Sequence, residues 1–299
     1  MENYRTHYIA IIGAGPAGIS TAIQLHRYGM DYVLLEKDRV GGLLWNANWI
    51  ENYPGFSGGI SGPQLVARLE MHMRQLGVRV VQEKVIELDM KDDQFIIKVA
   101  KGNRVSQSVV IASGTKPKMP SLKLKGSVGE GKILTDVWPL LQMKRKQILI
   151  VGGGDAAFDY ALNLGRKNAV TILNRGDRAK CIPLLLERVM NNPAIQHRTG
   201  ITVRRAEVWG TANRLRVEVF SSMETEFLEA DYLVFAIGRL PQLDFLSDKI
   251  TQQRSTLVKH GRLQFIGDVH NGSYRQAAIA AGEGIKAAMM LCARSAEAP

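Results

Sequence analysis

The chain has 299 residues, of which 45% are hydrophobic, and a formal net charge of +11 at neutral pH. This length exceeds that of a typical single domain and favours two domains with separate hydrophobic cores. No stretch reaches the roughly 18 consecutive apolar residues of a membrane span, and the N-terminal apolar run lacks the cleavage pattern of a secretion signal, so we expect a cytoplasmic protein.

The first predicted strand, residues 8–12, leads directly into the glycine motif GAGPAG at residues 13–18. A strand, a tight glycine turn and a helix are together typical of a dinucleotide site. The turn lets the backbone approach a pyrophosphate, and the helix N-terminus presents N–H groups to the phosphates. The next predicted strand, residues 32–35, ends at Glu36, 18 positions after Gly18. An acceptor for ribose hydroxyl groups belongs at this distance, so the spacing predicts a dinucleotide site.

A second glycine motif, GGGDAA at residues 152–157, follows a predicted strand at residues 147–151. The strand that comes next, residues 169–173, ends in an asparagine–arginine pair without an acidic residue. Because a carboxylate there repels a 2′-phosphate and an arginine attracts it, this copy favours NADP(H) over NAD(H). The alternative is that Arg175 and Arg178 are ordinary surface charges.

A predicted β-meander follows each glycine motif, and this repeated order indicates an internal duplication. The meander strands are residues 94–99 and 108–111 around a turn at 101–103 in the first copy, and residues 204–209, 215–220 and 232–236 around a turn at 210–213 in the second. A strand and a helix after residue 240 have no glycine loop of their own, so they complete the first copy. We therefore predict an α/β fold of two Rossmann-like domains, each a parallel sheet with helices plus a β-meander, the second inserted in the first.

Eight short segments, spread along nearly the whole chain, match a known family in the family's own order. They are GAGPAG at 13–18, GGLL at 41–44, ENYPG at 51–55, ASG at 112–114, GGGDAA at 152–157, AIGRLP at 236–241, GD at 267–268 and YRQA at 274–277. In these segments the chain resembles the thioredoxin reductase family of flavoproteins. The resemblance implies a homodimer in which residues 1–116 plus 243–299 form an FAD-binding domain and residues 117–242 form an inserted NAD(P)H-binding domain.

By this resemblance, FAD is bound through three regions of the first domain. The glycine loop holds the pyrophosphate, an acid after the second strand holds the adenosine ribose, and the start of the last helix faces the pyrimidine edge of the flavin, where N–H donors and positive charge stabilise the reduced ring. Asp268 is expected at the ribityl or pyrophosphate region, and Leu43 stands where the family usually has glutamine, so one polar contact to the flavin is missing. The residues assigned to FAD are Gly13, Gly15, Pro16, Ala17, Gly18, Glu36, Lys37, Gly42, Leu43, Asn52, Ala112, Gly114, Gly267, Asp268, Arg275, Gln276 and Ala277.

The resemblance also assigns a set of residues to the nicotinamide nucleotide. They are Gly152, Gly154, Asp155, Ala156, Ala157, Asn174, Arg175, Arg178, Lys180, Ile237 and Gly238. The family's HRRxxxR pattern reads NRGDRAK here, with Gly176 in place of an arginine. Losing one charged hydrogen-bond partner costs about 1.5 to 3 kcal/mol, so we expect NADP as the cofactor with relaxed discrimination against NAD.

The redox-active CxxC pair of the family is absent from this chain. Alignment back from Gly152 places TDVW, residues 135–138, at its position, and neither threonine nor tryptophan undergoes disulfide exchange. Trp138 is therefore either a core residue or a cover for the flavin face. The two cysteines, Cys181 and Cys292, form no CxxC and indicate no metal site. We do not expect a conventional thioredoxin reductase, and a disulfide reductase that uses these two cysteines is an alternative.

The second glycine motif also resembles that of the ferredoxin/flavodoxin–NADP reductases built on the same scaffold, which likewise lack the cysteine pair. The reaction implied passes a hydride from NADPH to FAD and then electrons to a ferredoxin, a flavodoxin or a quinone, with no protein acid or base and so no catalytic side chain. Residues 117–242 carry 19 lysines and arginines against 12 acidic residues, compared with 20 against 16 elsewhere. This basic excess, which includes Lys123, Lys125 and residues 144–146, favours an acidic redox partner; the alternative is a solvated basic surface.

The same features bear on two further function classes, nucleic-acid binding and non-catalytic nucleotide binding. The basic residues are not interleaved with an aromatic platform, so we do not expect nucleic-acid binding. A non-catalytic FAD- or nucleotide-binding module is the remaining alternative, and it would bind FAD but be reduced slowly by either nicotinamide nucleotide.

Overall fold

The chain divides into two units whose boundaries interrupt the sequence several times. The computed structural model describes residues 5–120, 123–125, 131–210, 214–221 and 224–297. Unit 1 comprises Met1–Trp45, Ile50–Lys116 and Leu240–Pro299, and unit 2 comprises Asn46–Trp49 and Pro117–Arg239. Residues 46–49 and 240–242 thus fall in the opposite unit from the one that the sequence-based boundaries give them.

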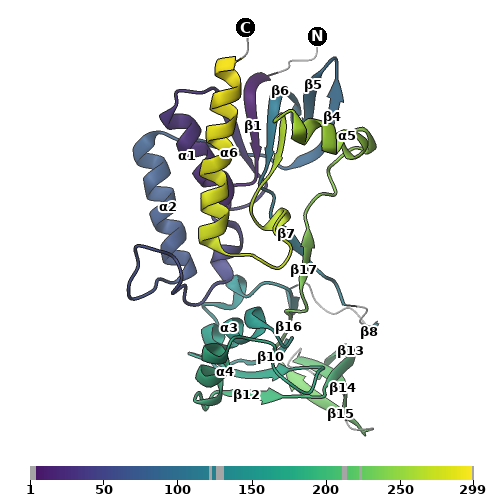
Figure 1. Ribbon diagram of the computed structural model, residues 1–299. Coiled ribbons are helices and arrows are strands. Elements are labelled where there is room, and N and C mark those ends of the chain that lie inside the picture. Colours follow the sequence, from purple (N-terminus) through teal and green to yellow (C-terminus); the bar gives the residue numbers. More distant parts are fainter. Residues whose placement is uncertain (1–4, 121–122, 126–130, 211–213, 222–223, 298–299) are drawn as a thin grey trace. The chain divides into compact units, whose positions relative to one another are not determined.

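Unit 1 is built on a mostly parallel sheet with β1 (Arg5–Ile12) at its centre. The strands run in the order β3-β2-β1-β6-β5-β4, and β18 also pairs with β6 (Figure 1). Their bounds are β2 Tyr32–Glu36, β3 Val80–Gln82, β4 Val85–Lys91, β5 Gln94–Val99, β6 Gly102–Ile111 and β18 Leu263–Phe265. The β4-β5-β6 pairs are antiparallel and form the meander, whereas β1 is parallel to both of its neighbours.

Both faces of this sheet are covered, so its central strands are apolar throughout. Side chains alternate along β1: Ile9 and Ile11 pack against helices, while Ala10 and Ile12 pack toward the meander. The first face carries α1 (Pro16–Arg27), α2 (Gly62–Leu76) and α6 (Ala277–Glu297), which lie side by side in Figure 1. The helix α5 (Asp248–Lys259) packs with the meander on the other face through Ile250 and Leu257. Two short 3-10 helices, η1 (Gly42–Asn46) and η3 (Gly267–Val269), complete the unit.

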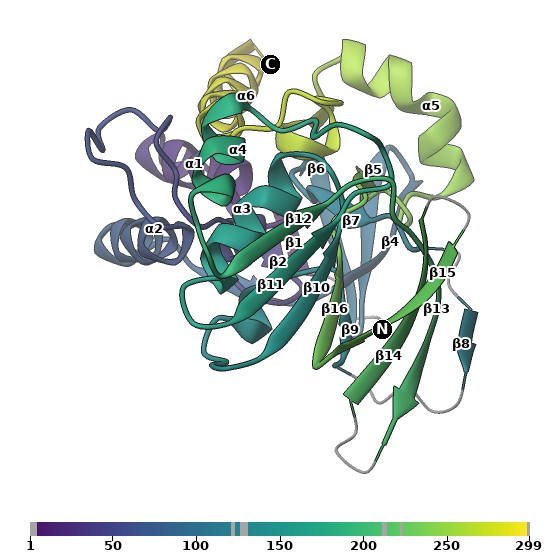
Figure 2. The ribbon, with the colours of Figure 1, turned by 90° about the horizontal axis from the view of Figure 1, so that it is seen from below.

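Unit 2 repeats this layering around β10. Its parallel sheet has the order β12-β11-β10-β16-β9, and a second sheet has the order β15-β14-β13-β8. The bounds are β8 Lys123–Lys125, β9 Ile133–Leu134, β10 Gln147–Val151, β11 Ala169–Leu173, β12 Ile195–Arg198, β13 Thr202–Trp209, β14 Arg214–Ser221, β15 Glu224–Ala230 and β16 Tyr232–Phe235, with helices η2 Trp138–Leu140, α3 Asp155–Leu164 and α4 Pro183–Met190. Ile148 and Ile150 face the helices and Leu149 faces the meander, so β10 alternates as β1 does. Figure 2 shows β11, β10 and β16 side by side in the parallel sheet.

Hydrogen bonds close each unit at the point where the chain crosses between them. In unit 1, the N–H of Gln242 donates to the carbonyl of Gly114 at 3.0 Å. In unit 2, the N–H of Lys118 donates to the carbonyl of Gly238, also at 3.0 Å. The flanking strands β7 (Thr115–Pro117) and β17 (Arg239–Pro241) pair with each other.

The predicted fold class, an α/β fold with two Rossmann-like domains that each carry a β-meander, is confirmed. The predicted strands at residues 94–99, 147–151 and 169–173 match the observed bounds, whereas β1 and β6 begin several residues earlier than predicted. Helix α5 has no counterpart in the prediction. Of the predicted turn at 210–213, residues 211–213 lie outside the described residues.

Candidate dinucleotide sites

The first glycine loop is shaped so closely that side chains are excluded at two of its positions. A Cβ atom on Gly18 would lie 1.8 Å from the carbonyl oxygen of Gly13, and one on Gly13 would lie 2.4 Å from that of Ala112. Gly13 also has a positive φ of +106°, which favours glycine. The loop therefore folds tightly between the ends of β1 and β6.

The N-terminus of α1 is open at the end of this loop. Gly15 occupies the N-cap position without a side-chain hydrogen bond, and Pro16 is at the start of the helix. A Cβ atom on Gly15 would meet nothing within 4 Å. Backbone N–H groups in a first turn have no intrahelical acceptor, so this end of α1 offers donors to an anion.

Two other predicted segments pack directly on the loop. The N–H of Gly41 donates to the carbonyl of Ala14 at 2.8 Å, and the adjoining Gly42 approaches Gly15. Gly267, which precedes Asp268 in η3, lies against the side chain of Ala17. The structure thus brings the 13–18, 41–42 and 267–268 segments together in unit 1.

Both carboxylate oxygens of Glu36 accept backbone N–H groups, and one of these groups belongs to the glycine loop. Oε2 accepts the N–H of Ala14 at 2.7 Å, and Oε1 accepts the N–H of Asp38 at 3.0 Å. The side chain is 8% exposed and reaches the wall of a cavity of about 270 Å³. The position predicted to hold a ribose therefore also ties β2 to the glycine loop.

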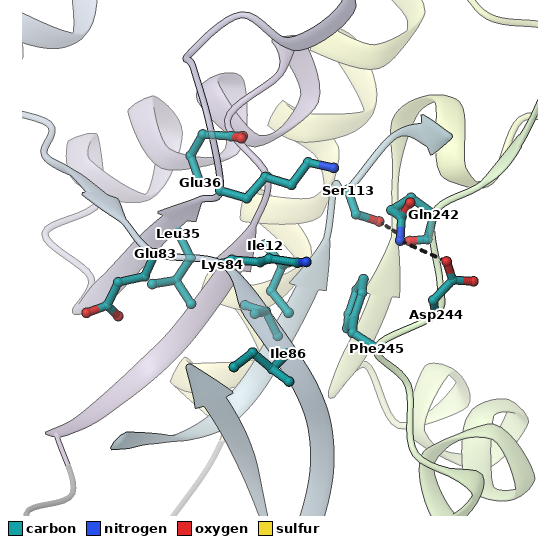
Figure 3. A pocket seen from close by; sticks show the side chains of 13 residues that line it. Ile12, Leu35, Glu36, Glu83, Lys84, Ile86, Ser113, Gln242, Asp244 and Phe245 are labelled. Carbon is teal, nitrogen blue, oxygen red and sulfur yellow. Dashed lines mark hydrogen bonds between the residues drawn. The ribbon is translucent and has the colours of Figure 1, made fainter. Parts of the chain in front are cut away.

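The cavity beside Glu36 has an apolar floor and charged residues at its rim (Figure 3). Figure 3 shows the Lys84 side chain directed toward Phe245, with Ile12 and Ile86 nearby. Its lining is Ile12, Gly13, Leu35, Glu36, Lys37, Glu83, Lys84, Val85, Ile86, Ser113, Gln242, Asp244 and Phe245. Of these, sequence reasoning found Gly13, Glu36 and Lys37; it missed the 83–86 and 242–245 segments, which carry no motif.

The remaining residues assigned to FAD lie at the start of α6 and near it. Asn52 donates through Nδ2 to Oε1 of Gln276 at 2.9 Å, which joins two predicted flavin contacts. The Nε atom of Arg275 is buried and has no hydrogen-bond partner in the described structure. Ala277 begins α6, and Leu43 lies in η1. A buried, unpartnered donor is costly, so Arg275 fits a site that a bound group completes.

The second glycine loop has a separate reason for each of its three glycines. A Cβ atom on Gly152 would lie 2.6 Å from the carbonyl oxygen of Ala236, and one on Gly153 would lie 2.4 Å from Oδ1 of Asn174. Gly154 is the N-cap of α3, has no side-chain cap and faces open space. The start of α3 therefore offers N–H donors to an anion as the start of α1 does.

A cavity of about 810 Å³ opens in front of this loop. It is lined by Pro120, Val151, Gly152, Gly153, Gly154, Asp155, Ala156, Leu173, Asn174, Arg175, Gly176, Lys180, Ile201, Thr202, Val203, Phe235, Ala236, Ile237 and Gly238. Two predicted residues are not part of the lining: Ala157 is fully buried beneath Gly152, and Arg178 is exposed outside it. Sequence reasoning missed the 201–203 segment, which follows β12.

The basic loop beside this cavity is tied to the glycine loop. The N–H of Lys180 donates to the carbonyl of Gly153 at 2.6 Å, and Oδ1 of Asp155 accepts the N–H of Ile182 at 2.8 Å. Asp155, predicted as a cofactor contact, thus anchors the end of the loop. In the described part of the chain, no carboxylate lies within ion-pair distance of Arg175 or Lys180, and an anion in the cavity would find both cations unneutralised.

A network of hydrogen bonds within unit 2 holds residues 136–138, part of the segment predicted to replace the family's CxxC pair. Oδ1 of Asn46 accepts the N–H groups of Val137 and Trp138 at 2.8 and 3.1 Å, and its Nδ2 donates to Asp136 at 2.9 Å. Arg239 also donates to Asp136. Asn46 is 3% exposed, so the 136–138 segment is held by a buried amide.

The surroundings of Cys181 do not activate its thiol. Cys181 is half-buried at the end of the basic loop, and burial, with a contribution from Asp155, raises its pKa. A raised pKa lowers the fraction of reactive thiolate. Cys292 belongs to α6 in unit 1, and both cysteines are free.

The described residues contain neither a metal-binding cluster nor a membrane-spanning helix. No cluster of three or more histidine, cysteine or acidic side chains is arranged to hold a metal ion there. Over the same residues, no helix has both the length and the apolar character needed to cross a bilayer.

Comparison with known proteins gives consistent matches over nearly the whole chain. The family model described as pyridine nucleotide-disulphide oxidoreductase matches residues 7–284. Thioredoxin reductase of Rickettsia felis is 28% identical over 301 residues, covering 95% of this chain and 96% of that protein. The bifunctional thioredoxin reductase/thioredoxin of Mycobacterium leprae is also 28% identical, and the match spans 64% of its length. The crystal structure of Lactococcus lactis thioredoxin reductase in its FR conformation has a TM-score of 0.85 at 24% identity, covering 98% of this chain and 100% of that one.

Proposed function

The chain belongs to the pyridine nucleotide-disulphide oxidoreductase family, and from this premise we propose that it uses NADPH and FAD to reduce an external acceptor without a protein dithiol. It is a flavin- and NAD(P)H-dependent oxidoreductase, because thioredoxin reductase-like members of the family use FAD and NADPH. The finer parts of the proposal are the nucleotide preference, the residue roles and the acceptor.

Unit 1 is the proposed FAD site. The open N-terminus of α1 supplies N–H donors to the pyrophosphate, and the glycines at 13 and 18 keep the backbone close enough to reach it. The cavity beside Glu36 would hold the adenosine portion. Asn52, Gln276 and the unpartnered Nε of Arg275 face the flavin end.

Unit 2 is the proposed NADPH site. The start of α3 receives the pyrophosphate, and Arg175 and Lys180 receive the 2′-phosphate. When both cofactors are bound, they supply the redox chemistry, in which the nicotinamide donates a hydride that the flavin accepts. The protein positions them and requires no side chain as acid or base.

The observation that carries the proposal is the hydrogen-bond network at residues 136–138. In place of the two cysteines, the chain has Thr135 and Trp138. Asn46 accepts the backbone N–H groups of Val137 and Trp138 and donates to Asp136. Thiol–disulfide exchange requires an attacking thiolate, and this segment has none. Electrons must therefore leave the flavin without an internal disulfide relay.

We propose that the acceptor is a ferredoxin, a flavodoxin or a quinone. The net charge of +7 over residues 117–242 supports an acidic protein partner, which long-range attraction would steer. The names of the relatives favour the competing candidate, a thioredoxin disulfide. Formation of a homodimer and a cytoplasmic location remain predictions.

Anaerobic stopped-flow of the FAD-loaded protein tests the first half of the reaction. Mixing with NADPH should bleach the flavin rapidly, and mixing with NADH should bleach it more slowly. If neither nucleotide bleaches it, the protein is a binding module or uses another donor, and the proposal fails.

Turnover with a panel of acceptors tests the second half. Ferredoxin, flavodoxin and a soluble quinone are compared with oxidised thioredoxin, for wild type and the Cys181→Ser/Cys292→Ser double variant. We expect turnover with the first group in both proteins. Thioredoxin reduction that disappears in the double variant would instead establish a disulfide reductase with atypical cysteines.

A further inference from the structure

Asn174 is buried at the end of β11, where an NAD-binding domain commonly has an acidic residue. Its side chain is 6% exposed and both of its polar atoms are used inside the protein. Oδ1 accepts the N–H of Gly176 at 3.1 Å, and Nδ2 donates to the carbonyl of Arg178 at 2.8 Å. One amide thus bridges two points of the loop that carries Arg175.

The backbone of Asn174 is fixed as well. Its N–H donates to the carbonyl of Arg198 at 2.8 Å, and its carbonyl accepts the N–H of Ile201 at 3.0 Å. Gly200 donates to the carbonyl of Gly176 at 3.2 Å. The amide is therefore attached to a rigid strand end, so it can impose a conformation on the residues that follow.

The same amide rests on the glycine loop. A Cβ atom on Gly153 would lie 2.4 Å from Oδ1 of Asn174, while the carbonyl of Gly153 accepts the N–H of Lys180 at 2.6 Å. Asn174 therefore leaves no room for a side chain at Gly153. The neighbouring Gly152 faces Ala236, and Gly154 faces open space. Asn174 and Lys180, at the two ends of the basic loop, thus both contact the glycine loop at Gly153.

We propose that Asn174 is a positioning residue that sets the preference for NADPH: it folds residues 175–180 so that Arg175 and Lys180 face a 2′-phosphate, and it acts through them instead of bonding to the nucleotide. This inference rests on the proposed NADPH site. The side chain must supply one acceptor and one donor at once, a requirement that asparagine meets and aspartate does not.

The test compares Asn174→Ala with a matched control in the same unit. Asn168 is also 6% exposed, and it likewise bridges backbone groups: it accepts the N–H of Lys146 and donates to the carbonyls of Met143 and Leu164. Asn168→Ala therefore removes an equally buried amide away from the nucleotide loop. Apparent dissociation constants for NADPH and NADH come from anaerobic flavin reduction of the full FAD-loaded chain, and that for 2′,5′-ADP comes from calorimetry.

We expect Asn174→Ala to lower the NADPH:NADH affinity ratio by about ten-fold or more, because two charge-assisted contacts lose their alignment. The ratio should stay at the wild-type value in Asn168→Ala. In the triple variant Asn174→Ala/Arg175→Ala/Lys180→Ala, the loss for NADPH should be close to that of the Arg175→Ala/Lys180→Ala double variant, since Asn174 acts through those two cations. Amide exchange at Gly176 should accelerate.

Equal weakening of NADPH and NADH would overturn the proposal, because it would mean that Asn174 contacts a part common to both nucleotides. A further loss of NADPH affinity in the triple variant, beyond that of the Arg175→Ala/Lys180→Ala variant, would overturn it too. If Asn174→Ala does not fold, Asn174→Ser, which keeps a shorter polar group, gives the same comparison. Failure of the proposed function itself is distinct, because then wild type binds neither NADPH nor 2′,5′-ADP.

Discussion

Asp159 of α3 accepts the N–H of Asn48 at 2.8 Å, although 111 positions separate the two residues. Arg166, two residues past the end of α3, donates to the side chain of the same Asn48 at 2.7 Å. Burial is the main influence on Asp159 and raises its pKa to about 6, against the lowering effects of these neighbours. Unit 2 therefore contains a carboxyl group that exchanges its proton close to neutral pH.

Replacement of Asp159 by asparagine should flatten the pH dependence of unit 2. The folded state holds a proton that the unfolded chain releases near pH 3.8, so the resulting stability is complete below that pH and is lost as pH rises through about 6. Two units of pKa correspond to about 3 kcal/mol. Urea unfolding at pH 4.5 and 7.5 should show about 2 kcal/mol of this loss in wild type and in an exposed control, Glu187→Gln. Asp159→Asn with a wild-type pH slope would contradict the assignment.

Alanine at Gly18 should remove FAD from the protein. The added Cβ would lie 1.8 Å from the carbonyl of Gly13, so α1 must move away from the loop. We expect FAD affinity to fall by about ten-fold or more, an overpacking cost of 1–3 kcal/mol. Gly58→Ala is the control, because a Cβ there meets nothing within 4 Å. Flavin content per chain, measured by absorbance after denaturation, decides the outcome; a full complement in Gly18→Ala would argue against this site.

Alanine at Gly152 should weaken the binding of NADPH without weakening the binding of FAD. The added atom would lie 2.6 Å from the carbonyl of Ala236 and 2.9 Å from the side chain of Ala157, which displaces the start of α3. NADPH binding should weaken by about ten-fold or more while FAD is retained. Titration calorimetry with NADPH and the flavin spectrum report the two effects independently. Loss of both cofactors together would indicate a general folding defect.

The three basic residues of the nucleotide loop should not be equivalent. Arg175 and Lys180 line the cavity and Arg178 does not, so Arg175→Ala and Lys180→Ala should each weaken NADPH by about ten-fold while Arg178→Ala changes it little. Raising the salt concentration should reduce these differences, because exposed charges are screened. A large effect at Arg178 would mean that the loop adopts another conformation when the nucleotide is bound.

The two candidate dinucleotide sites could be predicted from the sequence because the core of each site is one short continuous segment. Strand, glycine turn and helix follow one another within about 20 residues, and the apolar strands at 147–151 and 169–173 are buried on both faces, which leaves an unbroken apolar signal. The acid at position 36 was readable for the same reason, by its spacing from Gly18.

The rest of the site depends on contacts between distant residues, for which no local pattern exists. Asn46 reaches a segment 90 positions away, and part of the wall of the cavity beside Glu36, at residues 242–245, is distant from Glu36 in the sequence. Helix α5 was missed because its buried face consists of Ile250 and Leu257 in an otherwise polar segment. The role of Asn174 was equally hidden, since its sequence position suggests a ribose contact and its hydrogen bonds lie within the loop.

The hydrogen bonds from Gln242 to Gly114 and from Lys118 to Gly238 make unit 2 an exchangeable module. Because the entry and exit strands pair with each other, the chain between residues 118 and 238 forms one closed loop, and the entropic cost of closing a loop grows only slowly with its length. The same geometry marks residues 118 and 238 as splice points for chimaeras. A nucleotide-binding module with another coenzyme preference could be grafted there, with the flavin module left unaltered.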